Sequence, residues 1–164
     1  MSRIIDPETM FMTLAYTAAL CSKDVRTKVG AVIVGPGNEI ISIGYNGLPR
    51  GANDDDEERQ QRPGKYQWFE HAERNAIYNA ARVGVSVNNC TIYTPYYPCS
   101  DCMRAIIQSG IKRLVLDKWR YGLICAPSDA ARELADECNI EIKYMIVKIP
   151  KIVAFVREQE YSLA

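Results

Sequence analysis

The sequence predicts an α/β fold of three layers, in which a five-stranded mixed sheet lies between helices on both of its faces. Two patterns support this prediction. Short segments rich in β-branched residues alternate with segments of helical periodicity, and turn residues separate them. The length of 164 residues is enough for the core of a single domain. Functional groups are then expected near the ends of the elements, where loops and helix starts meet.

The first predicted elements are a helix and a β-hairpin. Asp6, Pro7 and Glu8 are typical of a helix start, with a capping side chain, a proline in the first turn and an acidic residue near the positive end of the helix dipole. Apolar periodicity extends this helix to about Cys21. Two β-branched strands follow, KVGAVIVG and EIISIGYNG, and the turn at residues 35–38 joins them.

A long charged segment, NGLPRGANDDDEERQQRPGKYQWF, separates the hairpin from the next apolar periodicity. Loops of this length in compact domains are usually functional. Asn53 is followed by acidic and then basic residues, which suits a short helix. A solvated charged excursion without regular structure is the alternative.

The rest of the chain alternates helices and strands. An alanine-rich helix is predicted from Glu70, and the later helices are SDCMRAIIQSG, ending at Gly110, and PSDAARELADECN, capped by Ser128. The later strands are CTIYT, KRLVLD and IEIKYMIV. The predicted order is α-β-β-α-β-α-β-α-β in one domain over 1–164. Its core spans about 5–147, with a charged insertion at about 52–67 and a C-terminal tail at about 148–164.

Composition argues against several classes of partner. Twenty basic and 20 acidic residues give zero net charge, so the chain lacks the positive field expected of a nucleic-acid-binding protein. No apolar run reaches the length of a membrane span and no secretion signal is recognisable, which predicts a cytoplasmic location without a membrane partner. A disulfide framework is therefore not expected. Four of the cysteines are predicted to be small core residues: Cys21, Cys90, Cys125 and Cys138.

The other two cysteines, Cys99 and Cys102, form the one CxxC of the chain. Thiols at i and i+3 in the first turn of a helix point to one side, and the helix N-terminus favours thiolates. His71, the only histidine, completes a set of one nitrogen and two sulfur donors that is typical of catalytic zinc with an open fourth position. A structural zinc would need a further ligand from a second chain.

Glu73 is the predicted general acid and base beside this metal site. Residues at i and i+2 lie on nearly opposite sides of a regular helix, so His71 and Glu73 cannot both face the metal from within one. We therefore expect His71 to lie at an irregular first turn.

HAE followed by PCSDC forms the H-x-E…P-C-x-x-C signature of zinc nucleobase deaminases. Through KVGAVIV, GYNGLPRG, HAERNAI and PCSDC, the chain resembles the cytidine and deoxycytidylate deaminase superfamily over roughly residues 5–147, and its deoxycytidylate branch in particular. The resemblance implies the cytidine-deaminase-like version of the α-β-α fold. Two departures stand out: Arg74 replaces a commonly aliphatic residue, and the insertion lacks the Cys and His that hold a second zinc in some relatives. One Zn²⁺ per chain is expected.

The resemblance implies hydrolytic deamination at C4 of cytosine. Glu73 takes a proton from a water activated by zinc and protonates N3 of the base. The backbone N–H of Ala72 holds the pyrimidine carbonyl, and a carbonyl near Pro98 receives the leaving amine. Asn46, in GYNG, contacts the deoxyribose.

Base and phosphate contacts are predicted from side-chain type. Tyr96, Trp119 and Tyr121 offer aromatic faces for stacking, although each alone is more often a packing residue. Four basic side chains are candidates to bind a 5′-phosphate, and Arg26 is the first choice among them. A surface Lys or Arg taken singly is more often simply solvated. The four are Arg26, Lys28, Arg50 and Arg120.

The function implied is deamination of dCMP to dUMP and ammonia, which feeds thymidylate synthesis. The alternatives are deamination of dCTP as well as dCMP, a tRNA-adenosine deaminase, and a non-catalytic module stabilised by zinc. The zero net charge and the GYNG segment argue against the tRNA enzyme, and the intact Glu73 argues against the module. By the same resemblance, dCTP is an expected activator, dTTP an expected inhibitor, and a homo-oligomer, often a hexamer, the expected assembly.

Overall fold

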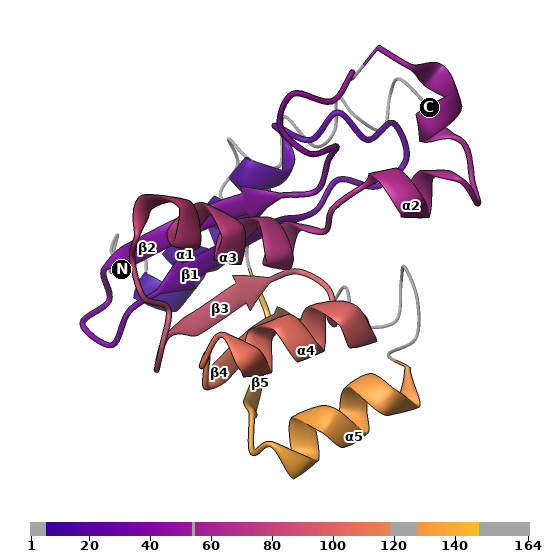
Figure 1. The fold of residues 1–164 in the computed structure, drawn as a ribbon. Coiled ribbons are helices and arrows are strands. Elements are labelled where there is room, and N and C mark those ends of the chain that lie inside the picture. Colours follow the sequence, from indigo (N-terminus) through magenta and orange to yellow (C-terminus); the bar gives the residue numbers. More distant parts are fainter. Residues whose placement is uncertain (1–5, 54, 119–127, 148–164) are drawn as a thin grey trace.

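The computed structural model describes residues 6–53, 55–118 and 128–147. Within these ranges, a five-stranded sheet has the strand order β2-β1-β3-β4-β5 (Figure 1). The strands are β1 (Gly30–Val34), β2 (Ile40–Tyr45), β3 (Thr91–Thr94), β4 (Arg113–Asp117) and β5 (Glu141–Met145). The helices are α1 (Pro7–Ala19), α2 (Lys65–Trp68), α3 (Ala72–Val83), α4 (Ser100–Gln108) and α5 (Asp129–Glu137), and a short 3₁₀ helix, η1, spans Glu57–Gln60.

The sheet is mixed, as the sequence predicts. β1 pairs antiparallel with both β2 and β3, whereas β3, β4 and β5 are parallel. The parallel strands are joined through α4 and α5, because a parallel connection needs a crossover segment. The carboxyl ends of β3 and β4 therefore lie at the same edge of the sheet.

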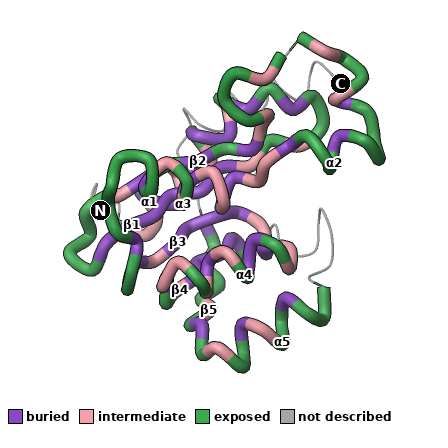
Figure 2. Tube along the Cα trace, viewed as in Figure 1, coloured by how far each residue is buried: buried purple, intermediate pink, exposed green. Residues whose placement is uncertain are grey.

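Helices cover both faces of the sheet, and the alternation of side chains along β1 shows how. Val32 and Val34 face α1, in a cluster with Phe11 and Met12. The intervening residues of β1 belong to a second cluster, which contains buried residues of α3, α4 and α5. Figure 2 shows that the central strands are buried while the insertion is largely exposed. The predicted three-layer architecture is confirmed.

The predicted caps of α1 and α5 are confirmed, but the end of α1 and the start of α3 differ from the prediction. Asp6 and Ser128 cap α1 and α5 by accepting from the backbone N–H groups of residues 9 and 131, respectively. α1 ends at Ala19 rather than near Cys21. α3 begins at Ala72 rather than at Glu70, because Glu70 is extended and pairs antiparallel with Gly47.

α3 packs very closely on β2. A Cβ atom placed on Gly44 would lie 2.3 Å from the backbone nitrogen of Ala76 and 2.4 Å from the carbonyl oxygen of Ala72. The Ser42 hydroxyl also donates to the carbonyl of Ala76, at 2.7 Å. The small residues on both elements therefore allow backbone contact, which fixes the position of the N-terminal end of α3 relative to the sheet.

The charged insertion contains more regular structure than the sequence predicts. The predicted short helix is the 3₁₀ helix η1, and its cap is Asp56 rather than Asn53. α2 was not predicted, because four residues, Lys65–Trp68, are too few to show helical periodicity. The pairing of Gly47 with Glu70 closes the segment at its base, so the insertion leaves and rejoins the core at adjacent points.

The prediction of four core cysteines is only partly correct. Cys90 is buried, but Cys21 is exposed and Cys138 is half-buried. The reason is that Cys21 follows the C-cap of α1 and Cys138 is itself the C-cap of α5, so both lie beyond the last buried turn. Cys125 lies outside the described residues, as does the C-terminal tail. Among the residues described, no helix has both the length and the apolar character needed to cross a membrane.

Candidate active site

The predicted metal ligands meet at the N-terminal ends of α3 and α4. His71 is the N-cap of α3 and Cys99 is the N-cap of α4, and both have an extended backbone. Cys102 lies in the first turn of α4 and is fully buried. Strand β3 carries the chain from one helix to the other, so a sequence separation of 28 residues between His71 and Cys99 closes into one site.

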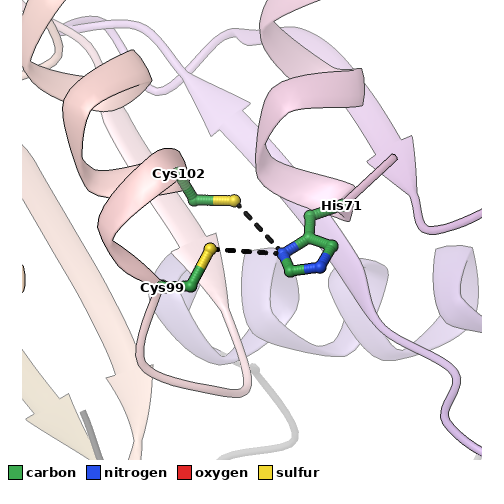
Figure 3. Close-up of side chains that lie close together, drawn as sticks. All are labelled: His71, Cys99 and Cys102. Atoms are coloured by element: carbon green, nitrogen blue, oxygen red, sulfur yellow. Dashed lines mark hydrogen bonds between the residues drawn. The ribbon is translucent and has the colours of Figure 1, made fainter. Parts of the chain in front are cut away.

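The geometry of the three donors fits a zinc ion. Nδ1 of His71 lies 3.5 Å from Sγ of Cys99 and 3.4 Å from Sγ of Cys102, and the close-up shows this nitrogen facing both sulfurs (Figure 3). A nitrogen and a sulfur bound to one tetrahedral zinc are separated by about 3.6 Å. All three ligand atoms lie within 4.8 Å of one another. His71, Cys99 and Cys102 thus hold positions suited to a single zinc ion, with Nδ1 as the imidazole ligand.

The two thiols have different proton affinities. The hydrogen bond with the Cys102 thiol, helped by one with His71, lowers the pKa of Cys99 to about 3. The pKa of Cys102 is raised, first because its proton is shared with Cys99 and then because the thiol is buried. Zinc binds cysteine as the thiolate, so its binding by both sulfurs requires both thiols to be deprotonated.

Glu73 lies within α3, two residues after His71, and its side chain is buried. In a regular helix, residues two positions apart would face nearly opposite sides, but His71 precedes α3 and has an extended backbone. The expected irregular position of His71 is therefore confirmed. Burial raises the pKa of the Glu73 carboxyl, against the opposing effect of His71. A carboxyl with a raised pKa beside a metal site is suited to accept a proton and then to donate it.

Arg74, the unusual residue after HAE, links the two helix starts. It forms ion pairs with Glu70, at the base of the insertion, and with Asp101 of α4, at 3.5 Å. Glu70 also accepts a hydrogen bond from the backbone N–H of His71, at 3.2 Å. Arg74 therefore connects the segment that carries His71 to the helix that carries the cysteines.

One pocket opens onto this site, and six of the predicted residues line it. His71, Glu73 and Cys99 line it, together with three of the predicted substrate contacts. These three are Asn46, Ala72 and Tyr96. Pro98 is buried directly before Cys99 but is not among the lining residues.

The predicted phosphate-binding cations lie elsewhere or outside the described residues. Arg26 and Lys28 are exposed and do not line the pocket. Arg50 is also exposed, and it donates to the side chain of Asn79 at 2.6 Å. The remaining predicted contacts, Trp119, Arg120 and Tyr121, lie outside the described residues.

Sequence reasoning missed several residues of the pocket. Tyr97 lines it beside Tyr96, and the YYPC segment could have indicated both. The insertion supplies Arg62, Lys65 and Tyr66, and the loop before β1 supplies Asp24. No local pattern indicated these four, because their place in the pocket depends on how the insertion folds against the core.

Residues 6–118 match the cytidine and deoxycytidylate deaminase zinc-binding region. The chain belongs to this family. The deoxycytidylate deaminase of Pongo abelii is 37% identical over 148 residues, which cover 87% of this chain and 82% of that protein. The deoxycytidylate deaminase of Homo sapiens is 36% identical over the same length, with the same coverage of both chains.

A solved structure shares the fold. The dCMP deaminase of cyanophage S-TIM5 in its apo form has a TM-score of 0.68 and 24% sequence identity, and covers 86% of this chain and 100% of that chain. The same enzyme in complex with dCMP and dUMP has a TM-score of 0.66. The five-stranded mixed sheet with its helices is therefore the fold of this family.

Proposed function

We propose that this chain is a zinc-dependent deaminase that converts dCMP to dUMP and ammonia, and so feeds thymidylate synthesis. The observation that carries the proposal is the cluster of His71, Cys99 and Cys102, with Glu73 lining the same pocket as His71 and Cys99. The family and the deoxycytidylate deaminases among its relatives support the choice of substrate.

The metal ligands and Glu73 have different roles in the proposed reaction. Zinc, when bound by His71, Cys99 and Cys102, supplies a Lewis acid that makes water acidic near neutral pH. Glu73 accepts a proton from the attacking water and passes it to N3 of the cytosine, while the water oxygen adds to C4. A second proton transfer through Glu73 to the exocyclic amine releases ammonia and leaves uracil.

Other groups at the pocket bind and orient the base. Ala72 is the first residue of α3, where backbone N–H groups have no acceptor within the helix, so its N–H can donate to the pyrimidine carbonyl. Tyr96 and Tyr97 place aromatic rings at the pocket wall, where they can stack on the base. The backbone carbonyl of Pro98 is our choice for the acceptor of the leaving amine. Trp119 and Tyr121 remain further stacking candidates.

A substrate panel tests the proposed function. Zinc-loaded protein should release ammonia from dCMP with a kcat/KM well above that for dCTP, deoxycytidine or tRNA. Comparable rates on dCTP would favour the broader nucleotide deaminase, and activity on tRNA alone would favour an RNA enzyme. No release from any of the four would favour the non-catalytic zinc module.

The proposal also includes a homo-oligomeric assembly, regulation by nucleotides and a cytoplasmic location. Exposed Ile43 and Tyr45 on edge strand β2, and Tyr78 on α3, support a homo-oligomer, for which a hexamer is our expectation. Activation by dCTP and inhibition by dTTP are proposed by family resemblance. A cytoplasmic location suits the cysteines described, none of which forms a disulfide.

The 5′-phosphate is proposed to bind Arg26, with help from Lys28 or Arg120. The backbone N–H of Arg26 donates to the pocket residue Asp24 at 2.9 Å, which holds this loop beside the pocket. Arg26→Ala should lower kcat/KM for dCMP by roughly 10- to 150-fold and leave the turnover of deoxycytidine nearly unchanged, because charge-assisted bonds to phosphate are lost. Steady-state ammonia release on both substrates measures this.

Arg62→Ala provides the comparison, since Arg62 lines the pocket and its guanidinium lies 5.7 Å from the ring of Tyr66. A selective loss of dCMP turnover in this variant, with none in Arg26→Ala, would move phosphate binding to the insertion. An equal loss on both substrates in Arg26→Ala would assign Arg26 to the fold.

A further inference from the structure

Arg74 occupies a position where a cation needs an explanation. It lies in the first turn of α3, where the positive end of the helix dipole disfavours positive charge. Its side chain is only 19% exposed, so solvation alone does not account for the charge. The proposed reaction gives this residue no part.

One end of the Arg74 guanidinium is bound to the segment that carries His71. Oε1 of Glu70 accepts from Arg74 and also from the backbone N–H of His71, the latter at 3.2 Å. The backbone of Glu70 is itself fixed beside the end of β2, because its N–H donates to the carbonyl of Gly47 at 2.8 Å and its carbonyl accepts from the N–H of Gly47 at 3.0 Å. Glu70 therefore offers Arg74 an anchor that is attached directly to His71.

The other end of the guanidinium reaches α4. Nη1 of Arg74 lies 3.5 Å from Oδ2 of Asp101, which lies in the first turn of α4 and directly precedes Cys102. Asp101 also pairs with Arg104, but that pair lies within α4. Arg74 thus bridges the two helix starts, whereas Arg104 does not.

The zinc ligands are divided across the same gap. His71 directly precedes α3, whereas both cysteines belong to the start of α4 (Figure 3). A metal held by the two thiolates keeps its nitrogen ligand only while the two helix starts stay together. A second connection across the gap keeps the imidazole close to the thiolates and so raises its effective concentration at the metal.

We propose that Arg74 is a positioning residue that clamps the start of α3 to α4 and thereby slows the release of zinc. The inference rests on the zinc site of the proposed function and deepens it. The clamp acts through position, because the carboxylates of Glu70 and Asp101 offset the charges of Arg74 and Arg104. Arg74 does not line the pocket, so no contact with substrate is assigned to it.

The test measures zinc release directly, as transfer of zinc from the loaded protein to an excess of 4-(2-pyridylazo)resorcinol. Arg74→Met keeps a long side chain but removes both ion pairs. Loss of a residue that supports a metal ligand commonly weakens metal binding by roughly 10- to 100-fold. Because Asp101 is 56% exposed and its pair with Arg74 is correspondingly weaker, Arg74→Met should release zinc about 3- to 30-fold faster than wild-type protein.

Two further variants isolate the bridge. Asp101→Asn breaks the clamp from the side of α4 and should also release zinc faster than wild-type protein. Arg74→Met combined with Asp101→Asn should differ from Arg74→Met by less than about twofold, because the two substitutions remove the same connection. Arg104→Met is the matched control, since it removes a partner of the same carboxylate without crossing the gap, and it should keep the wild-type rate.

Thermal unfolding of the zinc-free proteins separates a clamp from a residue that only supports the fold. A lower melting temperature of zinc-free Arg74→Met, with zinc release at the wild-type rate, would overturn the inference. Equal acceleration in Arg74→Met and Arg104→Met would also overturn it. Failure of the proposed function has a different signature, because wild-type protein that holds zinc but releases no ammonia from dCMP would refute the deaminase while the release rates still decide the clamp.

Discussion

Replacement of Glu73 by glutamine is expected to lower kcat for dCMP by about 10⁴-fold or more while the protein folds and retains zinc. A single general acid or base contributes roughly 10²- to 10⁴-fold, and Glu73 is required for successive proton transfers in one turnover. The amide has nearly the same shape as the carboxyl and fills the same buried position. It cannot accept and return a proton.

Steady-state ammonia release, with zinc content and circular dichroism measured on the same preparation, checks this expectation. Glu137→Gln makes the same chemical change on an exposed residue at the end of α5 and should keep wild-type activity. A Glu73→Gln protein with about a tenth of the wild-type kcat would show that Glu73 positions the substrate rather than transferring protons.

Loss of a metal ligand is expected to have the second largest effect. Wild-type protein should hold close to one equivalent of zinc after exhaustive dialysis, because the described residues contain a single cluster with ligand geometry, His71, Cys99 and Cys102. His71→Ala or Cys99→Ala should reduce the zinc to below about a tenth of an equivalent and abolish turnover, since two remaining donors hold zinc far more weakly than three.

Metal analysis by atomic absorption or mass spectrometry measures the zinc directly, without relying on activity. Cys138→Ala removes a thiol that lies outside the cluster and should leave the zinc content unchanged. Two equivalents in wild-type protein would contradict the expectation of one zinc per chain, and a ligand variant that keeps its zinc would contradict the assigned ligand set.

Much of the fold could be predicted because its signals are local. The cap at Asp6, the β-branched run of β1 and the alanine face of α3 each act within a few residues, and the structure has the predicted elements in the predicted order. The zinc ligands were predictable for a similar reason. Nitrogen and sulfur donors are rare in this chain, and HAE and PCSDC each place them at a helix start.

Several charged residues that line the pocket could be identified only from the tertiary structure. Asp24 and Lys65 are 41 residues apart, and they meet because the insertion folds back onto the loop before β1. The side-chain amide of Asn46 donates to the same Asp24 carboxylate. No periodicity or motif indicates which of the many charged side chains will be buried together, because their burial depends on long-range packing. The sequence by itself thus determined most of the elements and the metal ligands, while only the tertiary structure decided which charged residues meet in the pocket wall.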